Sequence, residues 1–258
     1  MSNFYSRWKR PLVRTKIFSG LAKYPHYLAD LFRYGRIDGA EPIKLRDTYP
    51  CLFDKTAKTG IDSHYFYQHV WAFEKIMAHK PTLHVDVGSN VDFVGLISTV
   101  TKVHFVDIRP MQVNNLPNLE SKYGSILELP YEDNSLESIS CLHVAEHIGL
   151  GRYGDPLDPL GTKKTAAELE RCLARGGNLY FSLPVGRPRL CFNAHRIHSP
   201  GQVLAYFSGL ELVEFSGTND AKQFLRNIRP EEFENERYAC GMFLFTKCTK
   251  PEGEAISI

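Results

Sequence analysis

The stretch HVDVGSNVDF, residues 84–93, decides the fold. Its apolar residues predict a buried strand over 83–87, and a polar turn follows at Gly88. A strand that ends in such a turn and leads into a helix is typical of the ligand-binding edge of an α/β sheet. The residues of this turn should therefore reveal which cofactor the chain can hold.

Strand and helix patterns alternate after this turn. Strands are expected over 83–87, 103–107, 138–143 and 178–183, and helices over 92–99 and 162–174, the latter with a stop signal at 176–177. Such alternation predicts right-handed crossovers, a mostly parallel sheet and helices on both faces. A helix over 200–209 and strands over 210–215 and 241–247 complete the pattern; lacking an evident crossover helix, these last strands predict an antiparallel C-terminal edge strand. The expected fold class is α/β and Rossmann-like.

Length and composition predict one large domain with an extension. The chain has 258 residues and is 43% hydrophobic, enough for a substantial core over 61–258. A net charge of +2 is not the signature of a dedicated nucleic-acid binder. We find neither an apolar run of roughly 18 residues nor a secretory signal, and we expect a cytoplasmic protein.

Residues 1–60 form a basic arm without a regular pattern. Up to Arg36 they contain eight Lys or Arg residues against one acid, Asp30. Phe4, Tyr5 and Trp8 lie among these basic residues, which favours weak peripheral contact with an anionic membrane. The alternative is an arm that packs on its own domain or on a second subunit of an oligomer. A helix over 62–78, capped by Asp62 or Ser63, should lead into the main domain.

The six cysteines contain no CxxC pair, and several lie in apolar runs. In a cytosolic chain this pattern predicts buried free thiols, with neither disulfides nor a metal site.

The turn itself argues against a dinucleotide. In a G-x-G-x-x-G fingerprint counted from Gly88, Asn90 takes the second glycine place and Phe93 takes the third, where close helix packing requires glycine. An NAD-dependent oxidoreductase is therefore disfavoured. Asn90 tolerates a left-handed backbone, and Asp92 can cap the next helix.

A second acidic residue lies at the end of the next strand. Asp107 follows Gly88 by about twenty residues, the spacing at which a carboxylate accepts hydrogen bonds from ribose hydroxyls. The alternative is that Asp107 only caps a turn before Pro110. Arg109 could pair with Asp107 or face an anionic substrate.

The segment YGSILELPYEDNSLESISCLHVAEHIG, residues 123–149, resembles class I S-adenosylmethionine-dependent methyltransferases, as does the acidic-x-Gly pattern of Asp86 and Gly88. The resemblance covers about residues 80–248 and includes RCLARGGNLYFSLPVG, residues 171–186. It implies S-adenosylmethionine as cofactor, with the turn holding its amino-acid end, Asp107 its ribose and the Ser125 region its adenine. The implied cofactor residues are Asp86, Gly88, Ser89, Asn90, Asp107, Ile108, Ser125, Ile126 and His143. This chain has Ser125 where the family usually has an acid.

A narrower resemblance comes from the strings DSHYFYQHVWAFEKI, HVDVGS, VDIRP, VAEHIGLGRYGDPLDPLG and FNAHRI. Together they are similar to an uncharacterised bacterial family, a domain of unknown function found among surface-polysaccharide genes. This likeness implies a sugar or glycan intermediate as the substrate.

Methyl transfer to a hydroxyl group needs a base that takes the proton, and histidine suits that role near neutral pH. His143 and His147 follow the fourth strand and share a face if a helix has begun there. With Asp155 they are the catalytic candidates, although a structural role for at least one histidine stays open. A metal is disfavoured because Glu146 lies off that face and no third ligand is evident.

Two segments after the fourth and fifth strands could bind the substrate. The loop GLGRYGDPLDPLG, residues 149–161, is rich in glycine and proline, which is typical of a binding loop or of a rigid turn held by its own Asp and Arg. The substrate candidates are Arg152, Tyr153, Asn193, His195 and Arg196. The sequence thus predicts a methyltransferase for a small molecule, with a non-catalytic methyltransferase-like binding protein in glycan assembly as the alternative.

Overall fold

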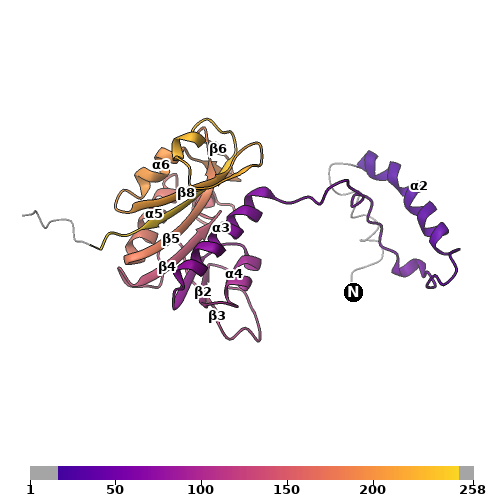
Figure 1. The fold of residues 1–258 in the computed structure, drawn as a ribbon, viewed down its shortest axis with the longest axis horizontal. Coiled ribbons are helices and arrows are strands. Elements are labelled where there is room, and N and C mark those ends of the chain that lie inside the picture. Colours follow the sequence, from indigo (N-terminus) through magenta and orange to yellow (C-terminus); the bar gives the residue numbers. More distant parts are fainter. Residues whose placement is uncertain (1–16, 250–258) are drawn as a thin grey trace, which may run out of the picture. The chain divides into compact units, whose positions relative to one another are not determined.

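The computed structural model describes residues 17–249 and divides the chain into two compact units, Met1–Ile61 and Asp62–Ile258. The first unit contains helix α2 (Ile17–Tyr34) and the 3-10 helix η1 (Leu45–Asp47) (Figure 1). An irregular arm was expected here, so α2 is a helix that the sequence analysis missed. Phe4, Tyr5 and Trp8 lie outside the described residues.

The second unit is built on one eight-stranded sheet. Its strands are β1 (Leu83–Val87), β2 (Lys102–Asp107), β3 (Leu119–Tyr123), β4 (Leu136–Leu142), β5 (Leu173–Val185), β8 (Glu211–Thr218), β9 (Phe224–Leu225) and β10 (Ala239–Thr246). The spatial order is β3-β2-β1-β4-β5-β10-β8-β9, and β1 to β5 pair in parallel. This arrangement confirms the mostly parallel, Rossmann-like fold.

The C-terminal part of the sheet is antiparallel. Strand β10 pairs antiparallel with both β5 and β8, and β9 pairs antiparallel with β8. The C-terminal strand β10 therefore lies inside this end of the sheet, and the two-residue β9 forms the edge.

Helices cover both faces of the sheet (Figure 1). Helices α3 (Ser63–His79) and α4 (Val91–Ile97) pack their Trp71 and Phe93 side chains into the core on one face. On the other face, α5 (Gly161–Cys172) and α6 (Pro200–Tyr206) contribute Leu169 and Val203 to a second core. The shorter elements are η2 (Ala145–His147), η3 (Pro230–Phe233) and the hairpin of β6 (Arg189–Cys191) and β7 (His195–Ile197).

Two predicted boundaries differ from the structure. Helix α5 ends at Cys172, and the predicted stop at 176–177 lies inside β5. A Cβ on Gly177 would come within 3.0 Å of the carbonyl oxygen of Leu136, so this glycine allows the close approach of strands β4 and β5.

His143 and His147 do not share a helical face, because the chain there forms only the 3-10 turn η2.

The cysteines are all free, as the sequence predicted, but only three are buried: Cys141, Cys172 and Cys240. Cys51 and Cys248 are exposed, which corrects the expectation that these thiols lie inside the fold.

The turn after β1 uses its residues differently from the prediction. Gly88 is the residue in the left-handed region, with φ of 68°, whereas Asn90 has φ of −61°. The Asn90 side chain caps α4, because its Oδ1 accepts hydrogen bonds from the backbone N–H groups of Asp92 at 2.8 Å and Phe93 at 3.4 Å. Asn90 is thus the cap that was assigned to Asp92. The cap of α3 is Asp62, one of the two predicted residues.

The capping role predicts how substitutions at Asn90 change stability. Replacing Asn90 with Ala should lower the free energy of unfolding by about 1 kcal/mol, whereas Asn90→Gly should lower it by only a few tenths of that. Chemical denaturation of the three proteins measures both effects. A stabilising Asn90→Gly would instead indicate a left-handed backbone at this position.

Candidate functional site

Two adjoining cavities lie at the carboxyl ends of β1, β2 and β4 in the second unit. The larger has a volume of about 540 Å³ and the smaller about 440 Å³. Gly88, His143, His147 and Tyr153 line both. A ligand in one cavity therefore lies next to a ligand in the other.

The larger cavity contains the residues predicted to hold a nucleoside. Asp107, Ile108, Ser125 and Ile126 all line it. Asp107 Oδ1 accepts a hydrogen bond from the Arg109 backbone N–H at 2.6 Å, and the Arg109 Nε lies 3.6 Å away. The carboxylate is thus fixed at the end of β2 with its other oxygen on the side of Gly88.

The absence of a side chain at Gly88 leaves open the space between Val144 and the Asp107 carboxylate. A Cβ at this position would lie 3.1 Å from Val144 Cγ1 and 3.6 Å from Asp107 Oδ2, so a side chain would fill the space in front of that carboxylate. The positive φ of Gly88 gives a second reason for glycine.

Asp86 was predicted to bind the cofactor, but it is fully buried and lines neither cavity. Its Oδ1 accepts the Ser89 backbone N–H at 3.0 Å, and its Oδ2 accepts the Ser140 hydroxyl. The Ser140 and Ser138 hydroxyls each lie 2.8 Å from a ring nitrogen of the buried His84. Asp86 therefore fixes the turn through buried hydrogen bonds and does not face either cavity.

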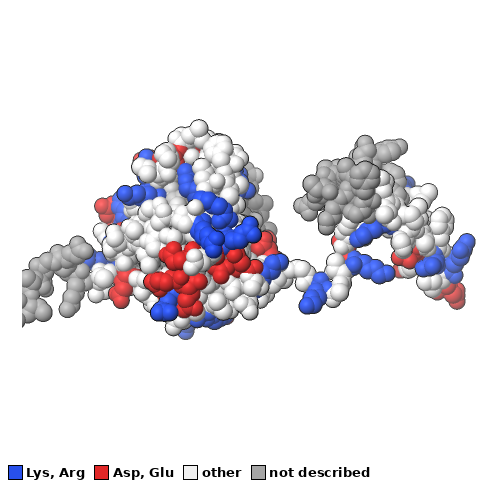
Figure 2. All heavy atoms as spheres, turned by 90° about the horizontal axis from the view of Figure 1, so that it is seen from above, with Lys and Arg blue, Asp and Glu red and all other residues white. Residues whose placement is uncertain are grey.

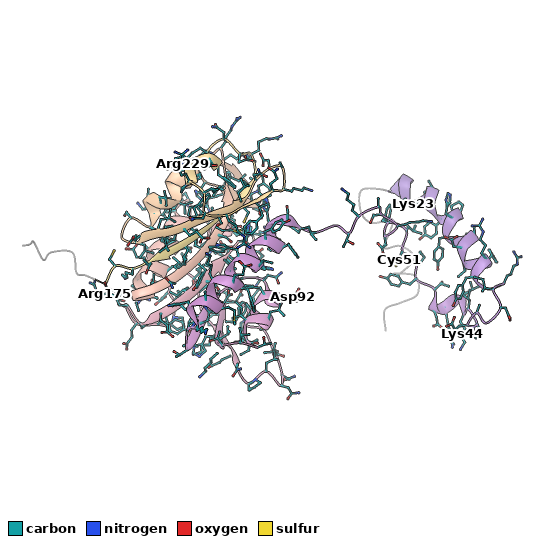
Figure 3. All side chains as sticks on the ribbon, in the orientation of Figure 1. Lys23, Lys44, Cys51, Asp92, Arg175 and Arg229 are labelled. Atoms are coloured by element: carbon teal, nitrogen blue, oxygen red, sulfur yellow. The ribbon has the colours of Figure 1, made fainter. Side chains whose placement is uncertain are left out.

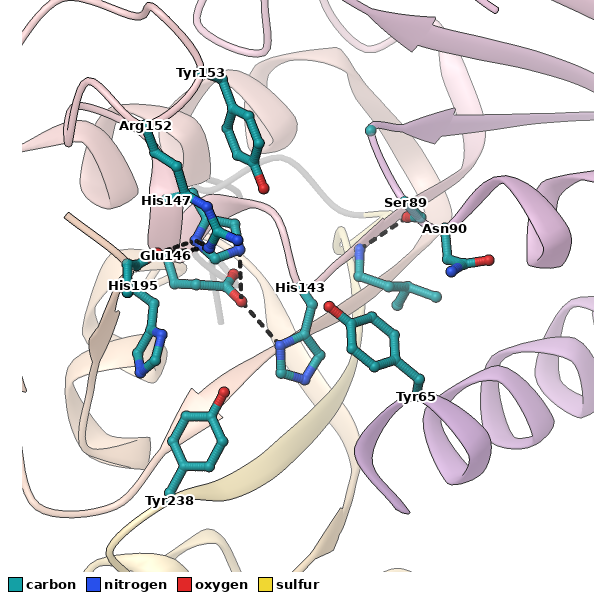
Figure 4. A pocket seen from close by; sticks show the side chains of 13 residues that line it. Tyr65, Ser89, Asn90, His143, Glu146, His147, Arg152, Tyr153, His195 and Tyr238 are labelled. Carbon is teal, nitrogen blue, oxygen red and sulfur yellow. Dashed lines mark hydrogen bonds and ion pairs between the residues drawn. The ribbon is translucent and has the colours of Figure 1, made fainter. Parts of the chain in front are cut away.

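A buried ion pair forms the floor of the smaller cavity. His143 Nδ1 lies 2.9 Å from Glu146 Oε1 (Figure 4). The other ring nitrogen, Nε2, lies 3.3 Å from Cys240 Sγ. Burial alone lowers the pKa of His143, but its interactions with Cys240 and Glu146 outweigh this effect and raise the pKa to about 10. His143 is thus protonated at neutral pH and cannot act as the predicted base.

Glu146 uses only one of its two carboxylate oxygens in this pair. Burial would raise the pKa of Glu146, but the charge and the hydrogen bond of His143 hold it below its usual range. The side chain is 1% exposed, and within residues 17–249 its Oε2 has no hydrogen-bond partner. An orphaned buried carboxylate oxygen is costly, which makes it a strong acceptor for a ligand donor.

His147 has the properties of a base. Its Nδ1 lies 2.6 Å from the carbonyl oxygen of Ala194 and 3.2 Å from Arg152 Nη1. Arg152 Nη1 donates to the same carbonyl oxygen at the shorter distance of 2.9 Å, so the proton of the neutral ring is assigned to Nδ1. The other nitrogen, Nε2, is 3.7 Å from Glu146 Oε1. Burial, the largest effect, lowers the pKa of His147, so the ring is neutral near pH 7.

Three tyrosine side chains line the smaller cavity around Glu146 and the two histidines. Figure 4 shows the hydroxyls of Tyr153 and Tyr238 directed towards the space around Glu146 from opposite sides, with Tyr65 beside His143. Burial raises the pKa of Tyr65 and raises that of Tyr238 to about 12, so both phenols stay protonated and can donate. The smaller cavity thus offers hydrogen-bonding groups on several sides.

Several predicted residues take up positions at this site. Ser89, Asn90, Arg152, Tyr153 and His195 line the smaller cavity, as do His143 and His147.

Two predicted residues, Asp155 and Arg196, hold the loop, although Asp155 also lines the larger cavity, and a third, Asn193, lies apart from the site. Asp155 Oδ2 accepts the Gly149 N–H at 2.6 Å and Oδ1 accepts the Tyr153 N–H at 3.2 Å, so both oxygens are engaged in the loop. Arg196 donates to the carbonyl oxygens of Ile148 at 2.6 Å and Asp158 at 2.9 Å and lines neither cavity. Asn193 is exposed and also lies outside both cavities.

Sequence reasoning missed Tyr65, Glu146 and Tyr238 as site residues. Tyr65 comes from α3 and Tyr238 immediately precedes β10, and no motif marks either position. Glu146 was set aside because a helical face was assumed. Among residues 17–249, no cluster of three or more His, Cys, Asp or Glu side chains could hold a metal ion.

One model of a known protein family matches part of the chain. Residues 122–243 match the model of DUF268, described as a Caenorhabditis protein of unknown function. That description names neither bacteria nor polysaccharides, which corrects the narrower resemblance proposed from the sequence. A search of curated proteins returned no match.

Solved structures match about seven-tenths of the chain. A putative sarcosine dimethylglycine methyltransferase from Galdieria sulphuraria is 17% identical, with 72% of this chain and 87% of that chain covered and a TM-score of 0.52. The cyclase SpnF is 12% identical, with 70% and 82% covered and a TM-score of 0.52. The YcgJ protein from Bacillus subtilis is 14% identical, with 70% and 100% covered and a TM-score of 0.50. These likenesses show the fold, which is that of class I methyltransferases.

The pKa values of His143 and His147 are shifted in opposite directions, upwards for His143 and downwards for His147. We expect His143 to stay doubly protonated at pH 8 and His147 to be neutral with its proton on Nδ1. Long-range proton–nitrogen NMR of the imidazole rings distinguishes these states. Glu146→Gln should lower the pKa of His143, and a neutral His143 at pH 7 in the unaltered protein would contradict the ion pair.

The same ion pair predicts a pH dependence of stability. The folded-state pKa of His143 is raised to about 10 from an ordinary value of 6.5. Its stabilising contribution is therefore fully present below pH 6.5 and is lost as the pH rises towards 10. Denaturation of the unaltered protein and of His143→Gln across this range should give a smaller decline for the variant; equal slopes would contradict the assignment.

Proposed function

We propose that this chain is an S-adenosylmethionine-dependent methyltransferase acting on a small hydroxylated molecule. One observation carries the proposal: two cavities at the carboxyl edge of a class I methyltransferase fold meet beside a neutral histidine. Ligands of open α/β sheets bind at this edge.

The larger cavity fits the nucleoside part of the cofactor. The Asp107 carboxylate can accept both ribose hydroxyls, and Ile108 and Ile126 supply apolar contacts for adenine. Ser125 Oγ accepts the Leu127 N–H at 3.2 Å, which leaves its own proton to donate to a ring nitrogen of adenine. When bound, S-adenosylmethionine supplies an electrophilic methyl group on a positively charged sulfur.

His147 is the residue that would take the acceptor proton. The bound cofactor would supply the methyl group to the acceptor oxygen, and His147 Nε2 would take the hydroxyl proton that this oxygen loses. The imidazolium that results lies 3.7 Å from the Glu146 carboxylate, which stabilises its charge. The Ala194 carbonyl holds the Nδ1 proton and keeps the ring in the required tautomer.

A sugar or glycan intermediate is the acceptor class we favour. The Tyr65, Tyr153 and Tyr238 phenols, the free Glu146 oxygen and the Arg152 side chain provide donors and acceptors for several hydroxyls. A role in surface-polysaccharide synthesis rests only on the sequence strings noted above. A methyl acceptor screen over free sugars, nucleotide sugars and glycans tests this class.

A second candidate is a methyltransferase-like binding protein in glycan assembly that does not catalyse transfer. The replacement of the family's acid by Ser125 favours it, because a carboxylate acceptor for the adenine amino group is absent at that position. The likeness to SpnF, named as a cyclase, also shows that this fold is not confined to proteins named as methyltransferases.

Cofactor binding separates these candidates and tests Asp107. We expect S-adenosylhomocysteine to bind the unaltered protein and Asp107→Ala to weaken binding by roughly a hundredfold, because two hydrogen bonds to a charged group are lost. The control is Asp92→Asn, which changes an acidic residue near the same turn that lines neither cavity. Equal affinity of Asp107→Ala and the unaltered protein in calorimetric titration would remove the ribose assignment.

Loss of the base should change turnover and leave cofactor affinity alone. We expect His147→Ala to bind S-adenosylhomocysteine normally and to reduce methyl transfer by about 10²- to 10⁴-fold, the usual range for general base catalysis. The unaltered enzyme should lose activity as the pH falls through the lowered pKa of His147. An unchanged rate in His147→Ala would show that another group takes the proton.

A further inference from the structure

The two units of the chain carry opposite net charge. Residues 1–61 contain 12 Lys or Arg residues and 5 Asp or Glu residues, a net charge of +7. Residues 62–258 contain 19 basic and 24 acidic residues, a net charge of −5. The balanced total of +2 therefore conceals a basic first unit. Figure 2 shows Lys and Arg side chains along this unit, and Figure 3 labels Lys23 and Lys44 on it.

The first unit also exposes an apolar stripe on α2. Leu21, Leu28 and Phe32 are separated by seven and four residues and so lie on one side of the helix. All three are exposed, Leu21 by 52% and Phe32 by 64%. Leu45 in η1 and Ile37 after α2 are exposed as well. A helix of this kind has an apolar side without a covering partner among the described residues.

We propose that α2 and its flanking basic residues bind the surface of an anionic lipid bilayer. Such a surface attracts Lys and Arg side chains, and its interface accepts leucine and phenylalanine side chains from a helix that lies in its plane. Among residues 17–249, no helix is long and apolar enough to cross a bilayer.

Charge and the apolar stripe together favour the bilayer over a second copy of this unit and over a nucleic acid. Two copies of the first unit would bring +7 against +7, so its pairing with itself is opposed by repulsion. A nucleic acid backbone would use the basic residues but would leave the stripe of Leu21, Leu28 and Phe32 in water. The acidic second unit is repelled by anionic lipid, which makes the first unit the part that must bind.

Cosedimentation with lipid vesicles tests the proposal on the full chain. We expect at least roughly tenfold stronger binding to phosphatidylcholine vesicles that contain phosphatidylserine than to phosphatidylcholine alone. Binding should fall when the salt concentration rises from about 0.1 M to about 0.5 M, because surface charges are then screened. Phe32→Glu should reduce binding by about tenfold, the loss expected from replacing a large inserted apolar group with a charge.

Leu96→Glu is the matched control, because Leu96 is an exposed apolar residue of α4 in the acidic unit with almost the same exposure, 63%. It should bind vesicles like the unaltered chain. Equal binding to both vesicle types, or equal loss in both variants, would overturn the proposal. Sedimentation without vesicles that Phe32→Glu abolishes, or binding to duplex DNA in place of vesicles, would assign the surface to another occupant and also overturn it.

Discussion

The buried Asp86 carboxylate is the constraint on which the rest of the site depends. Because Ser140 donates to Asp86, the Ser140 oxygen accepts from His84 Nε2, and His84 Nδ1 accepts from Ser138. Burial raises the pKa of Asp86 to about 6, although hydrogen bonds from Ser140 and Ser89 oppose this effect. The donors thus run from Ser138 through His84 and Ser140 to Asp86, which also accepts the Ser89 N–H, and these bonds fix the turn from which Gly88 faces both cavities.

The charges of the smaller cavity divide the chemistry between two histidines. Glu146 neutralises His143, and a buried pair of this kind is maintained only while both partners are present. His147 remains neutral beside the same carboxylate and is therefore free to accept a proton. Asp155 and Arg196 act outside this chemistry, because their hydrogen bonds to backbone groups hold the 149–161 loop in place. Tyr153, carried by that loop, can then line both cavities.

Sequence patterns predicted the parts of this arrangement that depend on local order. Strand β1 has the predicted bounds, and Asp107 ends β2 as expected, because period and spacing along one segment determine both. Patterns could not place Tyr65 and Tyr238, which reach the site only through the packing of α3 and the insertion of β10 between β5 and β8. The base role of His143 was wrong because its partner Cys240 becomes a neighbour only in the fold, whereas the hydrogen bonds of Asp155 agree with the predicted alternative of a turn held by its own Asp. Helix α2 was missed although Leu21, Leu28 and Phe32 recur at helical spacing, because it contains Pro25, a residue that usually ends or kinks a helix.

A crystal structure of the chain with S-adenosylhomocysteine would test the proposed roles of the two cavities. We expect the nucleoside in the larger cavity with its ribose on Asp107, and the sulfur where the cavities meet, facing His147. A ligand bound elsewhere, or a larger cavity that stays empty at saturating ligand, would contradict the assignment of these two cavities as cofactor and acceptor sites.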